Sequence, residues 1–312
     1  GRCTGCGRFT VDPTPPDLAM VCCPSGSEPY LAAEFQTRGQ EGDAQGVGYY
    51  VVGEGSRTAI LYLPDIWGWN GGRTRALADT LAADLQTSVW IPKILEPYQG
   101  GTDGDGLPPA FDMVSRRAEI APDRFKGPWH PSKTLPKVLK VVDAMRQSGV
   151  KRFGVLGVCY GAWVGFHLAK AVPSWELICG ASPHPSLHME GVVGGDPAAL
   201  ASEIRCPWAF FPCGEVGKDG ADPAIYDADG DVFRALEARF PGKNVTKRYR
   251  AVRHGFFARG AIKDGQFKAG DGDQVKRAVA ECVSDVSSFF RKRGLFRADA
   301  RSYLRMICWC CC

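Results

Sequence analysis

The amino-acid sequence predicts an α/β fold in which helices cover both faces of a central, mainly parallel β-sheet. Segments with the features of strands alternate along the chain with segments of helical periodicity. Several predicted strands are apolar throughout, which is typical of strands buried on both faces of a parallel sheet. The length of 312 residues is enough for a substantial core. We therefore expect one large α/β domain.

The predicted elements begin with two strands, residues 47–52 and 58–63, separated by the turn Gly-Glu-Gly-Ser at 53–56. A helix follows over residues 72–85, where three leucines are spaced by four positions. A short buried strand is expected at residues 89–91, which read Val-Trp-Ile.

Residues 93–133 contain many Gly and Pro residues and show no clean periodicity, so we expect a long excursion with at most one short helix. Such insertions in compact α/β domains often form lids or the walls of a site. Amphipathic and apolar segments then alternate again. They predict strands at 152–158, 177–181, 208–212 and 245–251, and helices at 135–146, 160–171, 232–240 and 274–291.

The thirteen cysteines divide into a group within the body of the chain and a group near its ends. Residues 1–24, rich in Cys and Pro, are a predicted extension, residues 294–312 a predicted tail, and the α/β domain covers 25–293. An odd number of cysteines without a secretory segment argues against a disulfide scaffold and favours a reducing, cytoplasmic compartment. Because the chain starts at Gly1 rather than Met, an upstream targeting segment stays an open alternative.

The charge pattern limits the classes of partner. The formal net charge is only +4, and no basic block is interleaved with aromatic residues, so we expect no nucleic-acid partner. No apolar run approaches the roughly 18 residues that a membrane span needs. We expect a monomer or a small homo-oligomer without a membrane span.

The heptapeptide GVCYGAW, residues 157–163, places Cys159 between two glycines, after an apolar strand and before a helix. In α/β hydrolases a nucleophile occupies the centre of such a G-x-Nuc-x-G turn, which is too tight for side chains at the flanking positions. Cys159 would then lie at the carboxyl edge of the sheet, where the positive end of the following helix favours a thiolate. The alternative is a structural thiol, because cysteine is among the most buried residue types.

His254 is the predicted general base, since in this fold the histidine follows the nucleophile and the acid along the chain. Gly255 lets the backbone bend beside it, and a loop histidine without a role is the alternative. His184 and His188 have a spacing that would suit a zinc pair on a helix, but Pro185 disrupts the helix which that pair would need. We therefore predict no metal site.

The acid that orients the histidine is expected in the segment after strand 208–212. Asp222 is the first choice, and Asp219 is the alternative. An oxyanion hole needs two backbone N–H groups, one from the residue after the nucleophile and one from the loop after the third strand. These belong to Tyr160 and to Ile66 or Trp67.

The motifs GVCYGAW, LPDIWGWNGGRTRALAD and HGFFARG, with the early CCPSGSEP, together resemble the dienelactone hydrolase family. They occur in that family's order, and the resemblance covers roughly residues 22–292. The family consists of α/β hydrolases that open cyclic enol-lactones with a cysteine nucleophile. The resemblance implies Cys159 as nucleophile, His254 as base, an acid within 219–222, and Ile66 and Tyr160 as the oxyanion hole.

The resemblance also implies roles for residues around the site. In the family an acidic residue after the third strand, often glutamate, contacts the resting thiol, and Asp65 stands at this position. An arginine shortly after the histidine binds the substrate carboxylate, and Arg259 matches it. A second family arginine comes from the excursion, for which Arg116 and Arg117 are candidates. Trp67 is expected in the pocket wall.

These residues predict a hydrolase of small-molecule carboxylic esters or lactones that works through an acyl-cysteine intermediate. A thiolate is a good leaving group, so the chemistry suits activated esters better than amides. No metal or organic cofactor is implied. The alternative, from another functional class, is a non-catalytic protein of the α/β-hydrolase fold that binds a small ligand or a protein partner.

Overall fold

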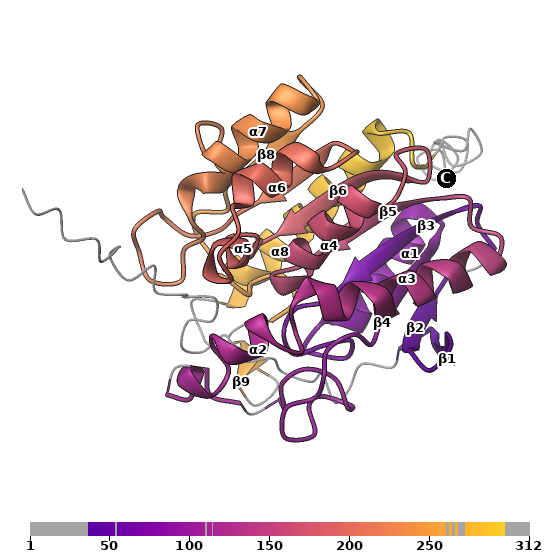
Figure 1. Ribbon diagram of the computed structural model, residues 1–312, viewed down its shortest axis with the longest axis horizontal. Coiled ribbons are helices and arrows are strands. Elements are labelled where there is room, and N and C mark those ends of the chain that lie inside the picture. The colour runs from indigo at the N-terminus through magenta and orange to yellow at the C-terminus, as the bar shows by residue number, and fades with distance from the viewer. Residues whose placement is uncertain are drawn as a thin grey trace, which may run out of the picture.

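The computed structural model describes residues 37–53, 55–109, 111–113, 115–259, 262–263, 266–267 and 272–296. Its main sheet contains β1 (Gln40–Asp43), β2 (Gly48–Val52), β3 (Thr58–Leu63), β4 (Ser88–Pro92), β5 (Arg152–Gly157), β6 (Leu177–Pro183), β7 (Trp208–Phe211) and β8 (Val245–Thr246). The strand order is β1-β2-β4-β3-β5-β6-β7-β8 (Figure 1). From β4 to β8 all neighbours in this order are parallel, and β1 and β2 pair antiparallel at one edge. The predicted, mainly parallel α/β architecture is therefore confirmed.

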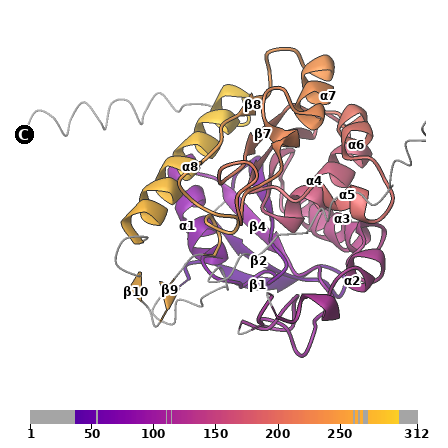
Figure 2. The same ribbon diagram turned by 90° about the vertical axis from the view of Figure 1, so that its left-hand side faces the viewer.

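Two helical layers cover this sheet. The helices are α1 (Thr74–Leu85), α2 (Asp123–Lys126), α3 (Pro131–Gln147), α4 (Tyr160–Ala171), α5 (Met189–Val192), α6 (Pro197–Glu203), α7 (Asp231–Arg239) and α8 (Gly272–Lys292). Helices α1 and α8 lie on one side of the sheet, and α3, α4 and α6 lie on the other (Figure 2). Two short 3₁₀ turns, η1 (Arg117–Glu119) and η2 (Ala224–Tyr226), and the two-stranded ribbon of β9 (Ile262–Lys263) and β10 (Gln266–Phe267) complete the described elements.

The central strands form because their sequences suit burial on both faces. Strand β3 is buried in all but its first residue, and so is β5. The edge of the sheet differs from the sequence prediction. Strand β1, Gln-Glu-Gly-Asp, is polar and mostly exposed, and it exists only through its pairing with β2. Strand β8 covers two residues rather than the predicted 245–251, because the chain then leaves the sheet except for one bridge at Tyr249.

The helical segments also differ in part from the prediction. The excursion at 93–133 contains η1 and the four-residue α2, and α3 begins at 131 rather than 135. His130 caps α3 by accepting the Ser132 N–H at 3.2 Å, and Pro131 suits the first helical position. Helices α5 and α6 were not predicted, because neither is long enough to display a helical period.

One hydrophobic core connects the sheet with both helical layers. It includes Leu295 and Phe296, which follow α8. The cysteines within the described residues are all buried and unbridged, whereas the terminal cysteines, the predicted extension at 1–24 and residues 297–312 lie outside the described residues. Among the helices that the structure describes, none has both the length and the apolar content that crossing a membrane requires.

Candidate active site

Cys159 stands at the sharp turn between β5 and α4, at the carboxyl edge of the parallel strands. Its backbone has φ 52° and ψ −116°, a strained conformation for a residue with a Cβ atom. A Cβ on Gly157 would lie 2.6 Å from the carbonyl oxygen of Gly161, and a Cβ on Gly161 would lie 2.0 Å from that of Leu63. The turn therefore requires glycine on both sides of Cys159, as a nucleophile elbow does.

His254 and Asp222 form a hydrogen-bonded series with Cys159. His254 Nε2 lies 3.1 Å from Cys159 Sγ, and His254 Nδ1 lies 2.6 Å from Asp222 Oδ1. All three residues are buried. Asp219, the alternative acid, is exposed, and its Oδ2 lies 3.6 Å from a guanidinium nitrogen of Arg253. The structure thus brings Asp222, rather than Asp219, to His254.

These groups shift one another's protonation. Burial acts against charge on His254, but Cys159 and Asp222 outweigh it and raise the pKa of His254 to about 9. Burial also acts against a thiolate, but the imidazolium of His254, with a smaller contribution from Arg259, holds the pKa of Cys159 below its ordinary value. Both shifts favour a thiolate–imidazolium pair, and the thiolate is the nucleophilic form of cysteine.

The loop that carries Asp222 is held by contacts that no sequence motif marks. The Cys213 N–H donates to Asp222 Oδ2 at 2.8 Å, while the other carboxylate oxygen meets His254. Arg248 Nη1 donates to the carbonyl oxygens of Cys213 and Asp222 at 2.9 and 3.0 Å. The same guanidinium pairs with Asp227, with Nε 2.8 Å from Oδ1. Arg248 therefore fixes the loop from a segment far along the chain.

Two backbone N–H groups are available at the pocket beside Cys159. In the described part of the chain, neither the Ile66 N–H nor the Tyr160 N–H donates to a protein acceptor, and both residues line this pocket. Tyr160 is the first residue of α4, where helical N–H groups have no partner within the helix. The Trp67 N–H donates to Asp65 Oδ1 at 2.9 Å. Of the two candidates after β3, Ile66 is therefore the one with an available amide.

Asp65 and Arg259 form a buried ion pair, with Arg259 Nε 2.8 Å from Asp65 Oδ2. The Arg259 guanidinium lies over the Trp67 ring, 4.5 Å from its centroid. Burial raises the pKa of Asp65, and Arg259 opposes this effect. In the structure Asp65 is thus engaged by Arg259 and the Trp67 amide, where the resemblance implied contact with the thiol. Arg259 pairs with a carboxylate of the protein, where the resemblance implied one of the substrate.

The segment after β6 adds two residues that the sequence analysis did not place at the site. Ser186 Oγ lies 3.4 Å from Cys159 Sγ. His184 packs edge-on against His254, with ring centroids 4.7 Å apart and planes at 70°. Both residues follow the strand next to β5, and neighbouring parallel strands end at the same edge. The sequence analysis predicted both strands, so their shared edge could have indicated that residues after the second strand lie near Cys159.

A nearly closed pocket adjoins these residues. Its volume is about 10 Å³, close to the smallest space that holds one water molecule. Its lining, mostly apolar, consists of Ile66, Met113, Arg117, Ala121, Phe125, Tyr160, Ser186 and Met189. Of the two candidate arginines, Arg117 is at this pocket, whereas Arg116 Nε pairs with Glu119 Oε1 at 2.7 Å. The excursion therefore supplies much of the pocket wall.

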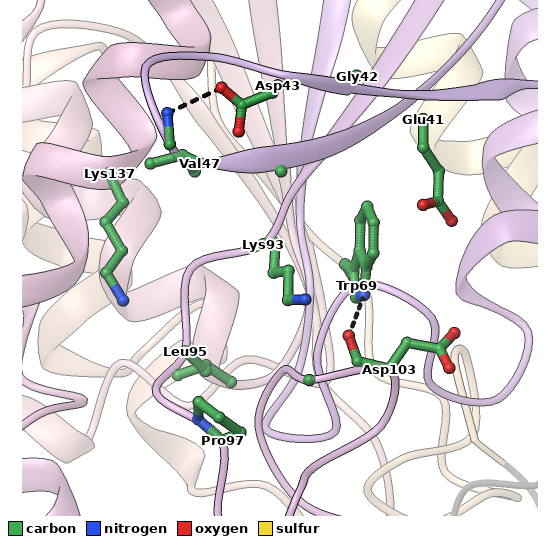
Figure 3. A pocket seen from close by; sticks show the side chains of 13 residues that line it. Glu41, Gly42, Asp43, Val47, Trp69, Lys93, Leu95, Pro97, Asp103 and Lys137 are labelled. Carbon is green, nitrogen blue, oxygen red and sulfur yellow. Dashed lines mark hydrogen bonds between the residues drawn. The ribbon is translucent and has the colours of Figure 1, made fainter.

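A larger groove of about 780 Å³ lies elsewhere, between the β1–β2 hairpin, the loop after β4 and α3 (Figure 3). Lys93 Nζ lies 5.3 Å from the centroid of the Trp69 ring, and Lys137 Nζ donates to the Ile94 carbonyl at 2.9 Å. Glu41, Asp43 and Asp103 also line the groove. The charges are mixed, and the groove shares no lining residue with the pocket at Cys159.

Two curated proteins named carboxymethylenebutenolidase homolog, a name for dienelactone hydrolases, match this chain in sequence. The Xenopus tropicalis protein is 28% identical over 169 residues, which are 53% of this chain and 62% of that protein. The Rattus norvegicus protein is 24% identical over 159 residues, which are 48% of this chain and 56% of that protein. The chain thus matches less than two thirds of the length of either relative. No protein-family model matches it.

Solved structures share the fold. A Klebsiella pneumoniae protein assigned as a dienelactone hydrolase has a TM-score of 0.53 and 17% identity, covering 80% of this chain and 99% of its own. A Pyrococcus furiosus esterase has a TM-score of 0.50 and 12% identity, and the match covers 83% of this chain and 91% of the esterase chain. A Pyrococcus horikoshii acylaminoacyl peptidase has a TM-score of 0.52 and 10% identity, and the match covers 85% of this chain and 43% of the peptidase chain. The chain therefore has the α/β-hydrolase fold, and its sequence is related to the dienelactone hydrolases that its motifs resemble.

Proposed function

We propose that this chain is a cysteine-dependent hydrolase of carboxylic esters or lactones. The observation that carries the proposal is the buried series from Cys159 through His254 to Asp222, with distances of 3.1 and 2.6 Å. The sequence similarity to carboxymethylenebutenolidase homologues supports the same class of reaction. Asp219 is exposed and pairs with Arg253, which supports Asp222 as the acid.

In the first half-reaction the Cys159 thiolate attacks the carbonyl carbon of the ester. The oxyanion that forms is stabilised by the N–H groups of Ile66 and Tyr160, which have no acceptor in the described part of the protein. The imidazolium of His254 gives its proton to the leaving alkoxide or enolate. The C–O bond breaks, and the acyl group stays on Sγ as a thioester.

In the second half-reaction neutral His254 takes a proton from a water molecule, and the hydroxide attacks the thioester carbonyl. Asp222 accepts the Nδ1–H of His254 throughout, which fixes the orientation of the ring and stabilises its positive charge. Collapse of the second oxyanion releases the carboxylic acid and restores the thiolate–imidazolium pair.

The pocket wall indicates the class of acyl group. Apolar side chains dominate it, and Arg117 is its one cation among the described residues. The chemistry of this lining suits a partly apolar ester or lactone that carries a carboxylate, because the guanidinium pairs well with a carboxylate. The pocket, with a volume of about 10 Å³, has to widen to admit such a substrate. Arg259 is already paired with Asp65, so we assign substrate-carboxylate binding to Arg117 and an electrostatic role near the thiol to Arg259.

The first experiment is a panel of lactones, aryl esters and thioesters assayed with the wild type and Cys159→Ala. We expect the variant to lose turnover by a factor on the order of 10⁴ or more, with an unchanged circular dichroism spectrum. Cys206→Ala is the matched control, since Cys206 is also a buried cysteine but is not part of the hydrogen-bonded series of Cys159, His254 and Asp222. Undiminished hydrolysis in Cys159→Ala would overturn the assignment, and a wild type inert on the whole panel would favour a binding protein.

The second experiment compares Arg117→Gln with Arg116→Gln. For an ester that carries a carboxylate we expect Arg117→Gln to raise KM by roughly tenfold, which corresponds to one charge-assisted hydrogen bond. A neutral aryl acetate should be hydrolysed by this variant as by the wild type. Arg116→Gln should leave both substrates unaffected, because Arg116 pairs with Glu119. Equal effects of the two substitutions would contradict the role of Arg117.

A further inference from the structure

Three potential metal-ligand atoms, one of them the sulfur of Cys159, lie close together in the candidate active site. Sγ of Cys159 and one ring nitrogen each of His184 and His254 all lie within 4.8 Å of one another, and all three residues are buried. The geometry points to a site for a divalent ion of the zinc class, held by Cys159, His184 and His254. The ion would be an inhibitor, because it occupies the atoms that the proposed reaction uses. This last consequence rests on the proposed function, whereas metal binding itself does not.

The buried, unsatisfied ring nitrogens of His184 are the observation that indicates a bound ligand. It is fully buried, and within the described residues neither of its ring nitrogens has a hydrogen-bond partner. Burying an imidazole with both polar atoms unsatisfied costs free energy, and native proteins rarely do so without a reason. Phe256 packs against the ring with centroids 5.7 Å apart, so the ring stays beside His254.

The donor set suits zinc. Thiolate sulfur and imidazole nitrogen are the ligands that zinc prefers, and a tetrahedral ion holds them about 3.6 Å apart. Cys159 Sγ and His254 Nε2 are now 3.1 Å apart, so they need to separate by only a few tenths of an ångström. The third ligand, a ring nitrogen of His184, lies within 4.8 Å of the other two atoms and has to move toward them as the ion binds. His254 gives its Nε2 proton to solvent as the metal binds.

The surroundings of the three ligands also resemble a metal site. His254 Nδ1 is hydrogen-bonded to Asp222 at 2.6 Å, and a carboxylate on the outer nitrogen is the usual support for a metal-binding histidine. Three protein ligands leave one position for water, on the pocket side where Ser186 touches the thiol.

The charge balance favours a cation. With neutral histidines, the thiolate of Cys159 and the carboxylates of Asp222 and Asp65 carry three negative charges. Arg259 and Arg73 both influence this cluster electrostatically, and together they contribute two positive charges. In the resting protein the imidazolium of His254 balances this cluster, and one net negative charge remains only after His254 has lost its proton on metal binding. A divalent cation compensates it at close range.

A second triplet, Cys213, Asp222 and His254, has equally close donor atoms. Both oxygens of Asp222 are already used there, by the Cys213 N–H and by His254. Burial also raises the pKa of the Cys213 thiol well above its ordinary value, which disfavours the thiolate that a metal needs. The triplet with His184 is the better site, because its third ligand has no competing partner among the described residues.

The test uses the full-length, reduced protein, freed of metal with a chelator and titrated with Co²⁺ and then Zn²⁺. We expect a thiolate-to-cobalt charge-transfer band that Zn²⁺ abolishes. His184→Asn should weaken this binding on the order of 100-fold, because a ligand is lost, and asparagine tolerates the φ of 34° at this position. His188→Gln is the matched control. That neighbouring histidine bonds Tyr226, with its Nδ1 3.1 Å from the hydroxyl oxygen.

The terminal cysteines are present in every variant, so cobalt binding to them contributes equally to the spectra of wild type and His184→Asn. A cobalt band of equal strength and affinity in His184→Asn and wild type would assign the metal to other thiols and overturn the proposal. Loss of the band in Cys213→Ala, but not in His184→Asn, would assign it to the second triplet and also overturn the proposal. Cys159→Ser, which removes the sulfur ligand, should abolish the band that His184→Asn weakens.

Inhibition is read separately, from aryl-ester hydrolysis with and without Zn²⁺. We expect reversible inhibition that a chelator relieves and that is about 100-fold weaker in His184→Asn. If the protein hydrolyses no ester yet shows the His184-dependent cobalt band, the metal site stands and the proposed function fails. If it hydrolyses esters but Zn²⁺ inhibits wild type and His184→Asn alike, the proposed function stands and the metal site fails.

Discussion

The contact between Cys159 and His254 makes the reactivity of the thiol depend on two titrations. The pKa of Cys159 is held below its ordinary value, mainly by the positive charge of His254 against the effect of burial, so the thiolate persists as the pH falls. The pKa of His254 is raised to about 9, so the imidazolium persists until the pH rises through that value. Between these limits both groups are charged, and each stabilises the charge of the other.

We therefore predict that the rate at which iodoacetamide labels Cys159 falls less between about pH 7.5 and about pH 6 than the rate for an ordinary thiol. An ordinary thiol, with a pKa of about 8.5, would react far more slowly at the lower pH. Mass spectrometry of the peptide that contains Cys159 measures the rate without relying on hydrolysis. A rate that falls tenfold for each pH unit below neutrality would show that His254 does not support the thiolate.

The choice of acid is also a property of single residues. Asp222→Asn should lower kcat/KM on the order of 10²- to 10⁴-fold, because an amide no longer stabilises the imidazolium or holds its tautomer. Asp219→Asn should change it by less than about twofold, since the Asp219 side chain is mostly exposed and forms a surface pair with Arg253. Steady-state kinetics on an aryl ester measures both. A larger loss in Asp219→Asn would exchange the roles of the two residues.

At the scale of elements, the ion pair of Asp65 and Arg259 joins the loop after β3 to the loop that follows His254. Both side chains are at most 1% exposed. Arg73 strengthens the same junction by donating through Nε to the Phe257 carbonyl at 3.2 Å. The buried Asp65–Arg259 salt bridge and the hydrogen bonds of Arg73 therefore join the loop of Ile66 to the loop that follows His254.

Asp65→Asn should lower the free energy of unfolding by about 3–5 kcal/mol, because it leaves the buried charge of Arg259 without its carboxylate. Urea denaturation followed by circular dichroism measures the loss. Asp231→Asn is the control. It breaks a pair with Arg234 in which both side chains are mostly exposed, and it should cost less than about 1 kcal/mol. Equal losses in the two variants would mean that the Asp65 contact contributes no more than a surface pair.

At the scale of the whole molecule, one core encloses all the cysteines of the described residues. Burial raises the pKa of Cys179, Cys206, Cys213 and Cys282, which makes these thiols poor nucleophiles. Cys159 is equally buried by area, but it stands beside the imidazolium of His254 and contacts Ser186, which lines the pocket. The fold thus lowers the pKa of one thiol and raises the pKa of the other four.

We predict that limited alkylation at neutral pH labels Cys159 in the native protein and leaves those four cysteines unlabelled. They should react only after unfolding in urea, and together, because they belong to one cooperative core. Peptide mapping by mass spectrometry at increasing urea concentrations measures this. Labelling of any of the four at the native rate of Cys159 would show that local opening, rather than the charge of His254, governs reactivity.

Elements with a strong local signal could be predicted from the sequence. Strand β3 and strand β5 are continuous apolar runs, and the glycines around Cys159 mark the turn between β5 and α4. Elements that form only through pairing with another part of the chain, or that are very short, could not be predicted from the sequence. Strand β1 is polar and exists only beside β2, and α5 and α6 are too short for a periodic pattern.

The sequence by itself determined the α/β class, the strand–turn–helix around Cys159 and the candidates His254, Asp222 and Asp219, because turns and apolar runs are local properties. Only the tertiary structure decided which acid meets the histidine, that Asp65 pairs with Arg259, and that His184 comes beside the nucleophile. These choices depend on how loops far apart in the chain meet at one edge of the sheet. Distances of that kind are set by packing, which no local pattern encodes.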